Sequence, residues 1–231
     1  MCRSSCPYSW VGSVPSVQGP ADSANPRLVV QFGLPPIAST LARRRVRGLH
    51  FDGALWPGYE AVAARDSAAA CFEILRFYRG LPMARLPALV AEFWRSPAGE
   101  RTWRLDVLAT LRYVAARGAA VFVVSATPTP VFGDLAATLG IAGIVGLELE
   151  VDADNRATGR HTGIPTLGEG KVTRLRASTV APCLLAAGNS ALDVPLLAAS
   201  RGLAWAVGPD ATLAAAAQRH GWLQTSDSPA P

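Results

Sequence analysis

The sequence predicts an α/β protein built on a doubly wound parallel sheet. Short apolar runs rich in β-branched residues alternate with segments of helical periodicity, most clearly after residue 118. This is the pattern of strands buried on both faces between crossover helices. Ser, Asn and Asp side chains follow these runs, at the edge where a parallel sheet gathers its functional groups. The 231 residues, half of them hydrophobic, suffice for one such domain with an insert.

The first half of the chain divides into an extension, a strand and a helical insert. Residues 1–45 are rich in Ser, Pro and Gly without periodicity, so we expect a disordered extension, with folded structure beginning near Val46. The run "VRGLHF" predicts a short strand that ends at the Asp52-Gly53 turn. Helical spacing then recurs in three blocks, at 68–80, 86–96 and 101–118. We expect a cap at 57–105.

Strands and helices alternate from residue 119 onward, and the two kinds of segment are given separately. We expect strands at 119–126, 143–152, 182–190 and 202–208. We expect helices at 130–140, 170–179, 193–200 and 210–221, and a polar hairpin-like segment at 153–163. The predicted core therefore consists of 46–56 and 106–224, and 225–231 is a flexible tail.

The net charge of +5 rests on arginine, because Lys171 is the only lysine. The arginines are scattered except in "RRRVR", and no aromatic residues interleave with that cluster, which argues against nucleic-acid binding. A basic chain suits small phosphorylated molecules or phosphate equally well. No apolar run reaches the length of a membrane span, and the four cysteines lack a second pair at metal-ligand spacing. We expect a cytoplasmic protein without membrane insertion.

Four segments fall in order at predicted strand ends or helix starts: "HFDGALW", "VVSATP", "GEGK" and "AAGNSALDVPLL". Together they resemble the four motifs of the haloacid dehalogenase superfamily, in its phosphoserine-phosphatase-like branch. The resemblance runs from about residue 46 to 224, and it implies a Rossmann-like core with a small helical cap after the first strand. It also implies a hydrolase acting on a small phosphomonoester with Mg²⁺, in which an aspartate of the first motif attacks phosphorus.

The first motif departs from the family pattern of Asp-x-Asp-Gly-Thr. A gapless alignment places His50 at the nucleophile position, Asp52 at the acid/base position and Ala54 at the threonine. A frame with Asp52 as the nucleophile would delete the turn that separates the two carboxylates. We therefore expect hydrolysis to be impaired, because the attacking carboxylate is missing.

His50 has two alternative roles, as a phosphorylated nucleophile or as a ligand for a softer metal such as zinc. Both roles need partners. The other two histidines, His161 and His220, fall in a hairpin segment and a C-terminal helix that this fold places away from the strand ends. We therefore expect His50 only to fill space.

The second and third motifs supply groups for the phosphoryl oxygens. The resemblance assigns the Ser125 hydroxyl and the backbone at Ala126 to phosphoryl binding, although Ser125 could instead only cap the following helix. It assigns Lys171 to neutralising the phosphoryl group, whereas an isolated helix lysine is commonly a solvated surface residue. The match of "GEGK" to the family favours the functional role.

The fourth motif departs from the family at its metal ligand. The resemblance places Gly188 against the substrate, Asn189 where the family has an acidic Mg²⁺ ligand, and Asp193 four residues later beside the metal site. The backbone carbonyl of Asp52 would be a further ligand. With His50 and Asn189 in place of carboxylates, the expected Mg²⁺ site loses about two negative charges.

Three hypotheses remain open after the motifs are read. The first is a phosphomonoesterase with reduced activity, and the second is a non-catalytic relative that keeps an anion pocket. The third is a partner-binding domain that uses the cap helices, because "FYRGLPMARLPALVAEFW" is apolar enough for an interface.

Overall fold

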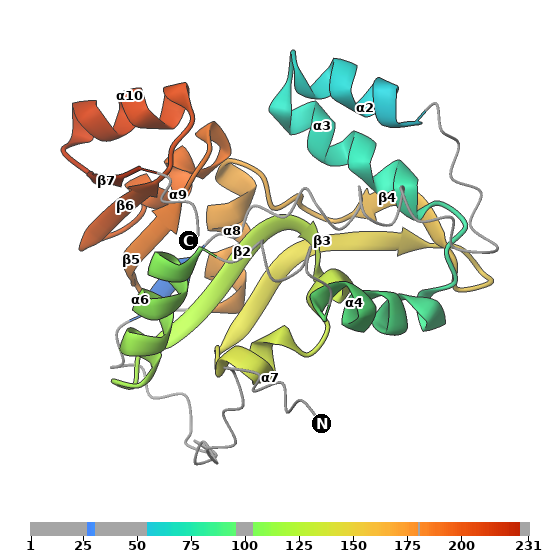
Figure 1. Ribbon diagram of the computed structural model, residues 1–231, viewed down its shortest axis with the longest axis horizontal. Coiled ribbons are helices and arrows are strands. Elements are labelled where there is room, and N and C mark those ends of the chain that lie inside the picture. Colours follow the sequence, from blue (N-terminus) through green and yellow to red (C-terminus); the bar gives the residue numbers. More distant parts are fainter. Residues whose placement is uncertain (1–26, 31–54, 96–103, 180, 227–231) are drawn as a thin grey trace, which may run out of the picture.

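A seven-stranded sheet forms the centre of the protein. The computed structural model describes residues 27–30, 55–95, 104–179 and 181–226 (Figure 1). The strand order is β4-β3-β2-β1-β5-β6-β7, and all neighbours are parallel except the antiparallel pair β3 and β4. The strands are β1 (Arg27–Val30), β2 (Ala120–Pro128), β3 (Gly143–Val151), β4 (Ala157–Thr162), β5 (Cys183–Gly188), β6 (Leu203–Val207) and β7 (Leu223–Thr225). The predicted α/β class with a parallel sheet is confirmed.

Helices connect these strands and build a separate cap. The core helices are α6 (Leu105–Ala115), α7 (Leu135–Leu139), α8 (Glu169–Ser178), α9 (Val194–Ala198) and α10 (Ala211–His220), with 3-10 turns η3 (Thr129–Phe132) and η4 (Ala191–Asp193). The cap contains α2 (Leu55–Ala63), α3 (Ser67–Glu73), η1 (Ile74–Tyr78), η2 (Met83–Arg85) and α4 (Leu86–Trp94). Within the described ranges, no helix is long and apolar enough to span a membrane.

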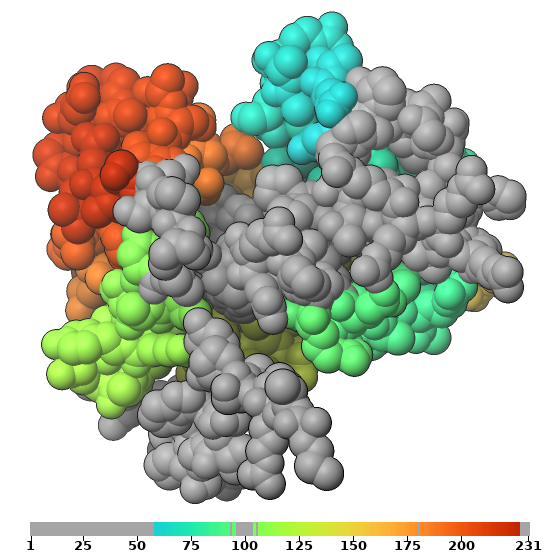
Figure 2. Space-filling view, viewed as in Figure 1, coloured from blue at the N-terminus to red at the C-terminus, as the bar shows by residue number. Residues whose placement is uncertain are grey.

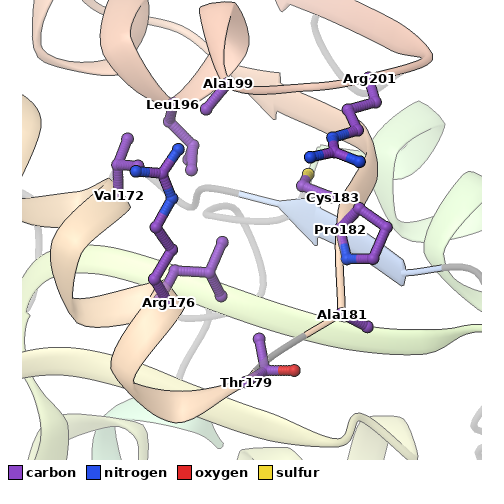
Figure 3. A pocket seen from close by; sticks show the side chains of 10 residues that line it. Val172, Arg176, Thr179, Ala181, Pro182, Cys183, Leu196, Ala199 and Arg201 are labelled. Carbon is purple, nitrogen blue, oxygen red and sulfur yellow. The ribbon is translucent and has the colours of Figure 1, made fainter. Parts of the chain in front are cut away.

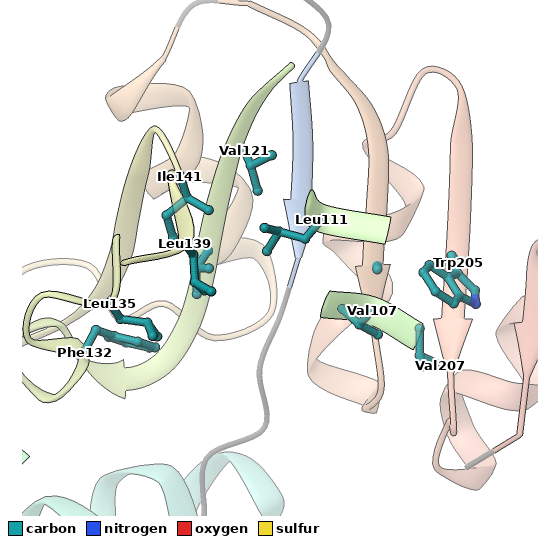
Figure 4. Close-up of a cluster of buried hydrophobic side chains, with 11 residues drawn as sticks. Val107, Leu111, Val121, Phe132, Leu135, Leu139, Ile141, Trp205 and Val207 are labelled. Atoms are coloured by element: carbon teal, nitrogen blue, oxygen red, sulfur yellow. The ribbon is translucent and has the colours of Figure 1, made fainter. Parts of the chain in front are cut away.

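One face of the sheet packs against α6 and α7 (Figure 4). Alternate residues of the strands point to this face, as the two-residue period of a strand requires. The buried cluster on this face comprises Val107, Leu111, Val121, Val123, Phe132, Leu135, Leu139, Ile141, Ala187, Trp205 and Val207. Helices α8, α9 and α10 cover the opposite face through Leu175, Leu196, Leu197 and Leu213. The sheet is therefore doubly wound, as predicted.

The cap packs on the hairpin of β3 and β4, which extends beyond the parallel sheet (Figure 1). Leu75, Tyr78, Leu86 and Val90 of the cap are buried against strand residues that include Leu147. The apolar segment that suggested a partner interface is thus accounted for largely by packing inside the chain. The structure therefore gives no independent support to the partner-binding hypothesis.

Among the described residues, the first strand is β1, which lies at the centre of the sheet between β2 and β5. It falls within residues 1–45, so the folded core begins earlier than the predicted start near Val46. Four residues give too short an alternation to stand out in a segment rich in Ser, Pro and Gly. The strand predicted over residues 46–51 lies outside the described residues. The boundaries proposed for the cap and tail remain predictions.

Two smaller differences have local causes. The helix predicted at 130–140 is divided into η3 and α7, because Gly133 has a φ of 53°, which a continuous right-handed helix does not allow. Helix α2 and strand β7 were not predicted. Helix α2 contains Pro and Gly, and β7 is short, so the periodicity of each is weak.

Removal of β1 should prevent folding, whereas removal of the residues before it should not. A chain that begins at Asn25 keeps β1 and should unfold cooperatively in denaturant. A chain that begins at Arg43 loses it and exposes the facing backbone edges of β2 and β5, so cooperative unfolding should be lost. Denaturant titration followed by circular dichroism measures both. Equal, cooperative unfolding of the two chains would contradict a core that begins at β1.

Candidate functional site

The carboxyl ends of β2, β1 and β5 meet at one edge of the sheet. Val30, the last residue of β1, pairs with Val123 and Ala187. The end of β1 therefore lies between the segment that carries Ser125 and the segment that begins at Gly188. In open parallel sheets this edge is where ligands bind.

A buried ion pair joins the third and fourth motifs. Lys171, in the first turn of α8, places its Nζ 2.5 Å from Oδ1 of Asp193, the residue that precedes α9. Both side chains are fully buried. Each charge removed from water costs several kcal/mol, so neither is stable here without the other. Lys171 is therefore not a solvated surface residue, which was the alternative role considered for it from the sequence.

The second oxygen of Asp193 holds the loop that follows β5. Its Oδ2 accepts hydrogen bonds from the backbone N–H groups of Asn189 and Ser190, both at 3.0 Å, and from Oγ of Ser190 at 3.1 Å. Gly188 is required beside it, because a Cβ there would lie 2.5 Å from Cβ of Asp193. Asp193 therefore fixes Lys171 on one side and the loop on the other.

A second carboxylate, missed by the sequence analysis, fixes the same loop. Oδ2 of Asp210 accepts a hydrogen bond from the N–H of Ala191 at 2.7 Å, and Oδ1 accepts one from Leu213 at 2.8 Å. The backbone N–H of Asp210 donates to the carbonyl of Asn189. The sequence did signal one part of this role, since Asp before a helical run is a common N-cap.

Ser125 lies in a bulge at the end of β2. Val124 pairs with Val145 and Pro128 with Leu147, so residues 125–127 stand opposite Gly146 alone. A Cβ at Gly146 would lie 2.6 Å from the carbonyl oxygen of Thr127, so glycine allows the bulge. Such bulges commonly direct side chains at functional sites. Ala126, within the bulge, is half-buried.

The Ser125 side chain is buried, and its Oγ accepts a hydrogen bond from the N–H of Thr127 at 3.1 Å. It does not cap the following 3-10 turn, whose N-cap is Pro128. Oγ1 of buried Thr166 donates to the carbonyl of Ser125 at 2.6 Å. Thr166 thereby ties the loop before α8 to β2, a role that no local sequence signal indicated.

The cap contributes a thiol to the surroundings of the ion pair. Burial raises the pKa of Cys71 on α3, while the charge of Lys171 lowers it and the charge of Asp193 raises it. Burial also raises the pKa of Tyr59 on α2, and Cys71 adds to that rise. Figure 2 shows α2 and α3 standing apart from α10, with a hollow between them.

The three histidines and Asp52 are the remaining residues that the sequence singled out. His50 and Asp52 fall outside the described residues. His161 stacks on Phe72 of the cap, and His220 stacks on Trp222, each with ring centroids 4.9 Å apart.

The described residues do not fit a Mg²⁺ site. Mg²⁺ requires a near-octahedral set of oxygen ligands and favours carboxylates. Both oxygens of Asp193 and both of Asp210 already accept hydrogen bonds, and Asn189 offers only a neutral amide. Over the described ranges, no group of three or more His, Cys, Asp or Glu side chains is placed to hold a metal ion.

Comparison with known proteins places this chain in a family. The profile of the haloacid dehalogenase-like hydrolases matches residues 23–198, so the chain belongs to that family. The match begins before β1, which agrees with a core that starts there.

The relatives confirm the resemblance to the phosphoserine-phosphatase-like branch. Phosphoserine phosphatase SerB1 of Mycobacterium tuberculosis is 31% identical over 164 residues, which cover 69% of this chain and 52% of that protein. The chain thus spans about half the length of the curated relatives that it matches.

Two solved structures share the fold. A protein of unknown function from Bordetella pertussis Tohama I has a TM-score of 0.72 and 24% identity, over 88% of this chain and 99% of that one. A substrate-bound phosphoserine phosphatase has a TM-score of 0.60 and 14% identity, over 88% and 93% of the two chains. At these identities the likeness concerns the fold alone.

Replacing Lys171 should destabilise the protein strongly. Lys171→Met leaves the Asp193 carboxylate buried without its cation, which should lower the free energy of unfolding by about 3–5 kcal/mol. As a control, Arg174→Gln removes the partly exposed ion pair with Glu148 from the same helix and should cost less than about 1 kcal/mol. Denaturant titration measures both. Equal losses would contradict a structural role for the buried pair.

Proposed function

We propose that this protein binds small phosphomonoesters at the carboxyl edge of its sheet and hydrolyses them poorly. The observation that carries the proposal is the buried Lys171–Asp193 pair next to the strand ends. The pair holds the Lys171 ammonium beside the strand ends. It also engages Asp193, the one acidic side chain of the fourth motif, in structural contacts. Binding and hydrolysis therefore have different requirements at this site.

Anion binding is supported by the charge and backbone at the strand ends. The Lys171 ammonium is the chain's only lysine charge, and the bulge at residues 125–127 interrupts the ladder between β2 and β3 at the carboxyl end of β2. An ammonium together with backbone and hydroxyl groups suits phosphoryl oxygens. The hydroxyl of Ser125 and the backbone at Ala126 and Gly188 are the proposed substrate contacts.

Poor hydrolysis is supported by the carboxylates that are missing. No Asp or Glu occurs between Val30, where β1 ends, and Asp52. The sequence that follows β1 thus offers no nucleophilic carboxylate before Asp52. Asn189 is neutral, and Asp193 is engaged with Lys171 and three donors from the loop. A metal-assisted attack would lack both its nucleophile and much of its metal site.

The first substrate to test is a phosphorylated amino acid. The similarity to phosphoserine phosphatases in sequence and fold suggests O-phosphoserine as a ligand. The cap supplies Tyr59 and Cys71, groups that could select the organic part of such a ligand.

Turnover should be slow even with Mg²⁺ present. We expect phosphate release from O-phosphoserine and from p-nitrophenyl phosphate at rates about a thousandfold below the median enzyme kcat of about 10 per second. Colorimetric phosphate detection measures the rate, and calorimetry with O-phosphoserine, against serine as a control, measures binding. Rapid native turnover that is abolished by Asp52→Asn would contradict impairment. A gain in a His50→Asp, Asn189→Asp double variant would support it.

A further inference from the structure

A cavity lies near the start of β5, at the opposite end of that strand from the candidate phosphate site. It has a volume of about 410 Å³ and is lined by residues of α8, of α9 with its C-cap, and of the start of β5 (Figure 3). Cys183, the first residue of β5, lines it, whereas Gly188 at the other end of that strand belongs to the candidate site. The two residues are five positions apart along the strand, which corresponds to about 16 Å.

The cavity carries positive charge without a compensating acid. Arg176 of α8 and Arg201, which precedes β6, both line it, and none of its ten lining residues is acidic. Figure 3 shows the two side chains on opposite sides of the cavity. Among the residues described, no carboxylate forms an ion pair with either guanidinium. Two guanidinium groups at one cavity favour a carboxylate or phosphate between them.

The inner wall combines apolar side chains with one unsatisfied polar atom. Val172, Leu175 and Leu196 supply apolar surface. Oγ1 of Thr179 is buried and has no hydrogen-bond partner within the described part of the chain. A buried hydroxyl without a partner is unfavourable, and a polar ligand atom would satisfy it. The cavity size also falls within the range of small-molecule sites.

We propose that this cavity is a second ligand site, which binds a small organic anion. The carboxylate or phosphate of the ligand lies between Arg176 and Arg201, and its apolar body packs on Leu175 and Leu196. Residues of α8 and of α9 with its C-cap line the cavity, and Lys171 and Asp193 lie at the starts of these two helices. Its ligand is thus distinct from the substrate of the candidate phosphate site.

Binding of benzoate and of phenyl phosphate to the full chain, measured by calorimetry, tests the proposal. An Arg176→Gln, Arg201→Gln double variant should weaken binding at the cavity about tenfold or more, because two charge-assisted contacts are lost. Tighter binding of phenyl phosphate at the cavity would identify a phosphate ligand, and tighter binding of benzoate a carboxylate. Ala199→Leu, which fills the cavity without changing charge, should also weaken binding of both.

A matched control separates the cavity from general charge. Arg112→Gln with Arg219→Gln removes the same charge from exposed positions on α6 and α10 and should leave the affinities unchanged. The proposal is overturned if the native chain binds neither probe, if the control weakens binding as much as the cavity variant, or if neutral benzamide binds as well as benzoate.

Discussion

The site depends on one ion pair that is excluded from water. Lys171 and Asp193 come from different helices, and each would be unstable at its position alone. Their contact fixes the start of α8 against the start of α9. The second oxygen of Asp193 extends the constraint to the loop after β5, and Gly188 leaves the space that this arrangement needs. Helix placement and loop conformation at the sheet edge therefore follow from one interaction.

The same interaction shapes the chemistry that we propose. A carboxylate that accepts an ammonium and three other donors has little capacity left for a divalent cation. In the family to which this chain belongs, the corresponding strand ends support hydrolysis. Here the neutral Asn189 and the absence of acidic residues from 31 to 51 leave a site whose described charge is balanced without metal. Retention of anion binding without efficient hydrolysis is the outcome that these residues favour.

Much of the fold was predictable because its signals are local. Apolar runs such as residues 119–126 mark buried strands, and Lys171 in "GEGK" was found from motif order. The central strand β1 was missed because four residues in a Ser- and Pro-rich segment carry almost no periodicity. Thr166, Asp210 and the cavity at Arg176 and Arg201 could not be predicted, because each depends on contacts between segments distant in the chain.

The most direct test of this account is whether the candidate site needs magnesium to bind phosphate. Orthophosphate affinity can be measured by calorimetry with Mg²⁺ and with a chelator. The Arg176→Gln, Arg201→Gln variant is used, because it lacks the positive charge of the cavity near the start of β5. The account predicts binding that changes less than about twofold between the two conditions, because Lys171 and backbone groups supply the attraction. Binding that requires Mg²⁺, or that strengthens about tenfold with it, would contradict the account.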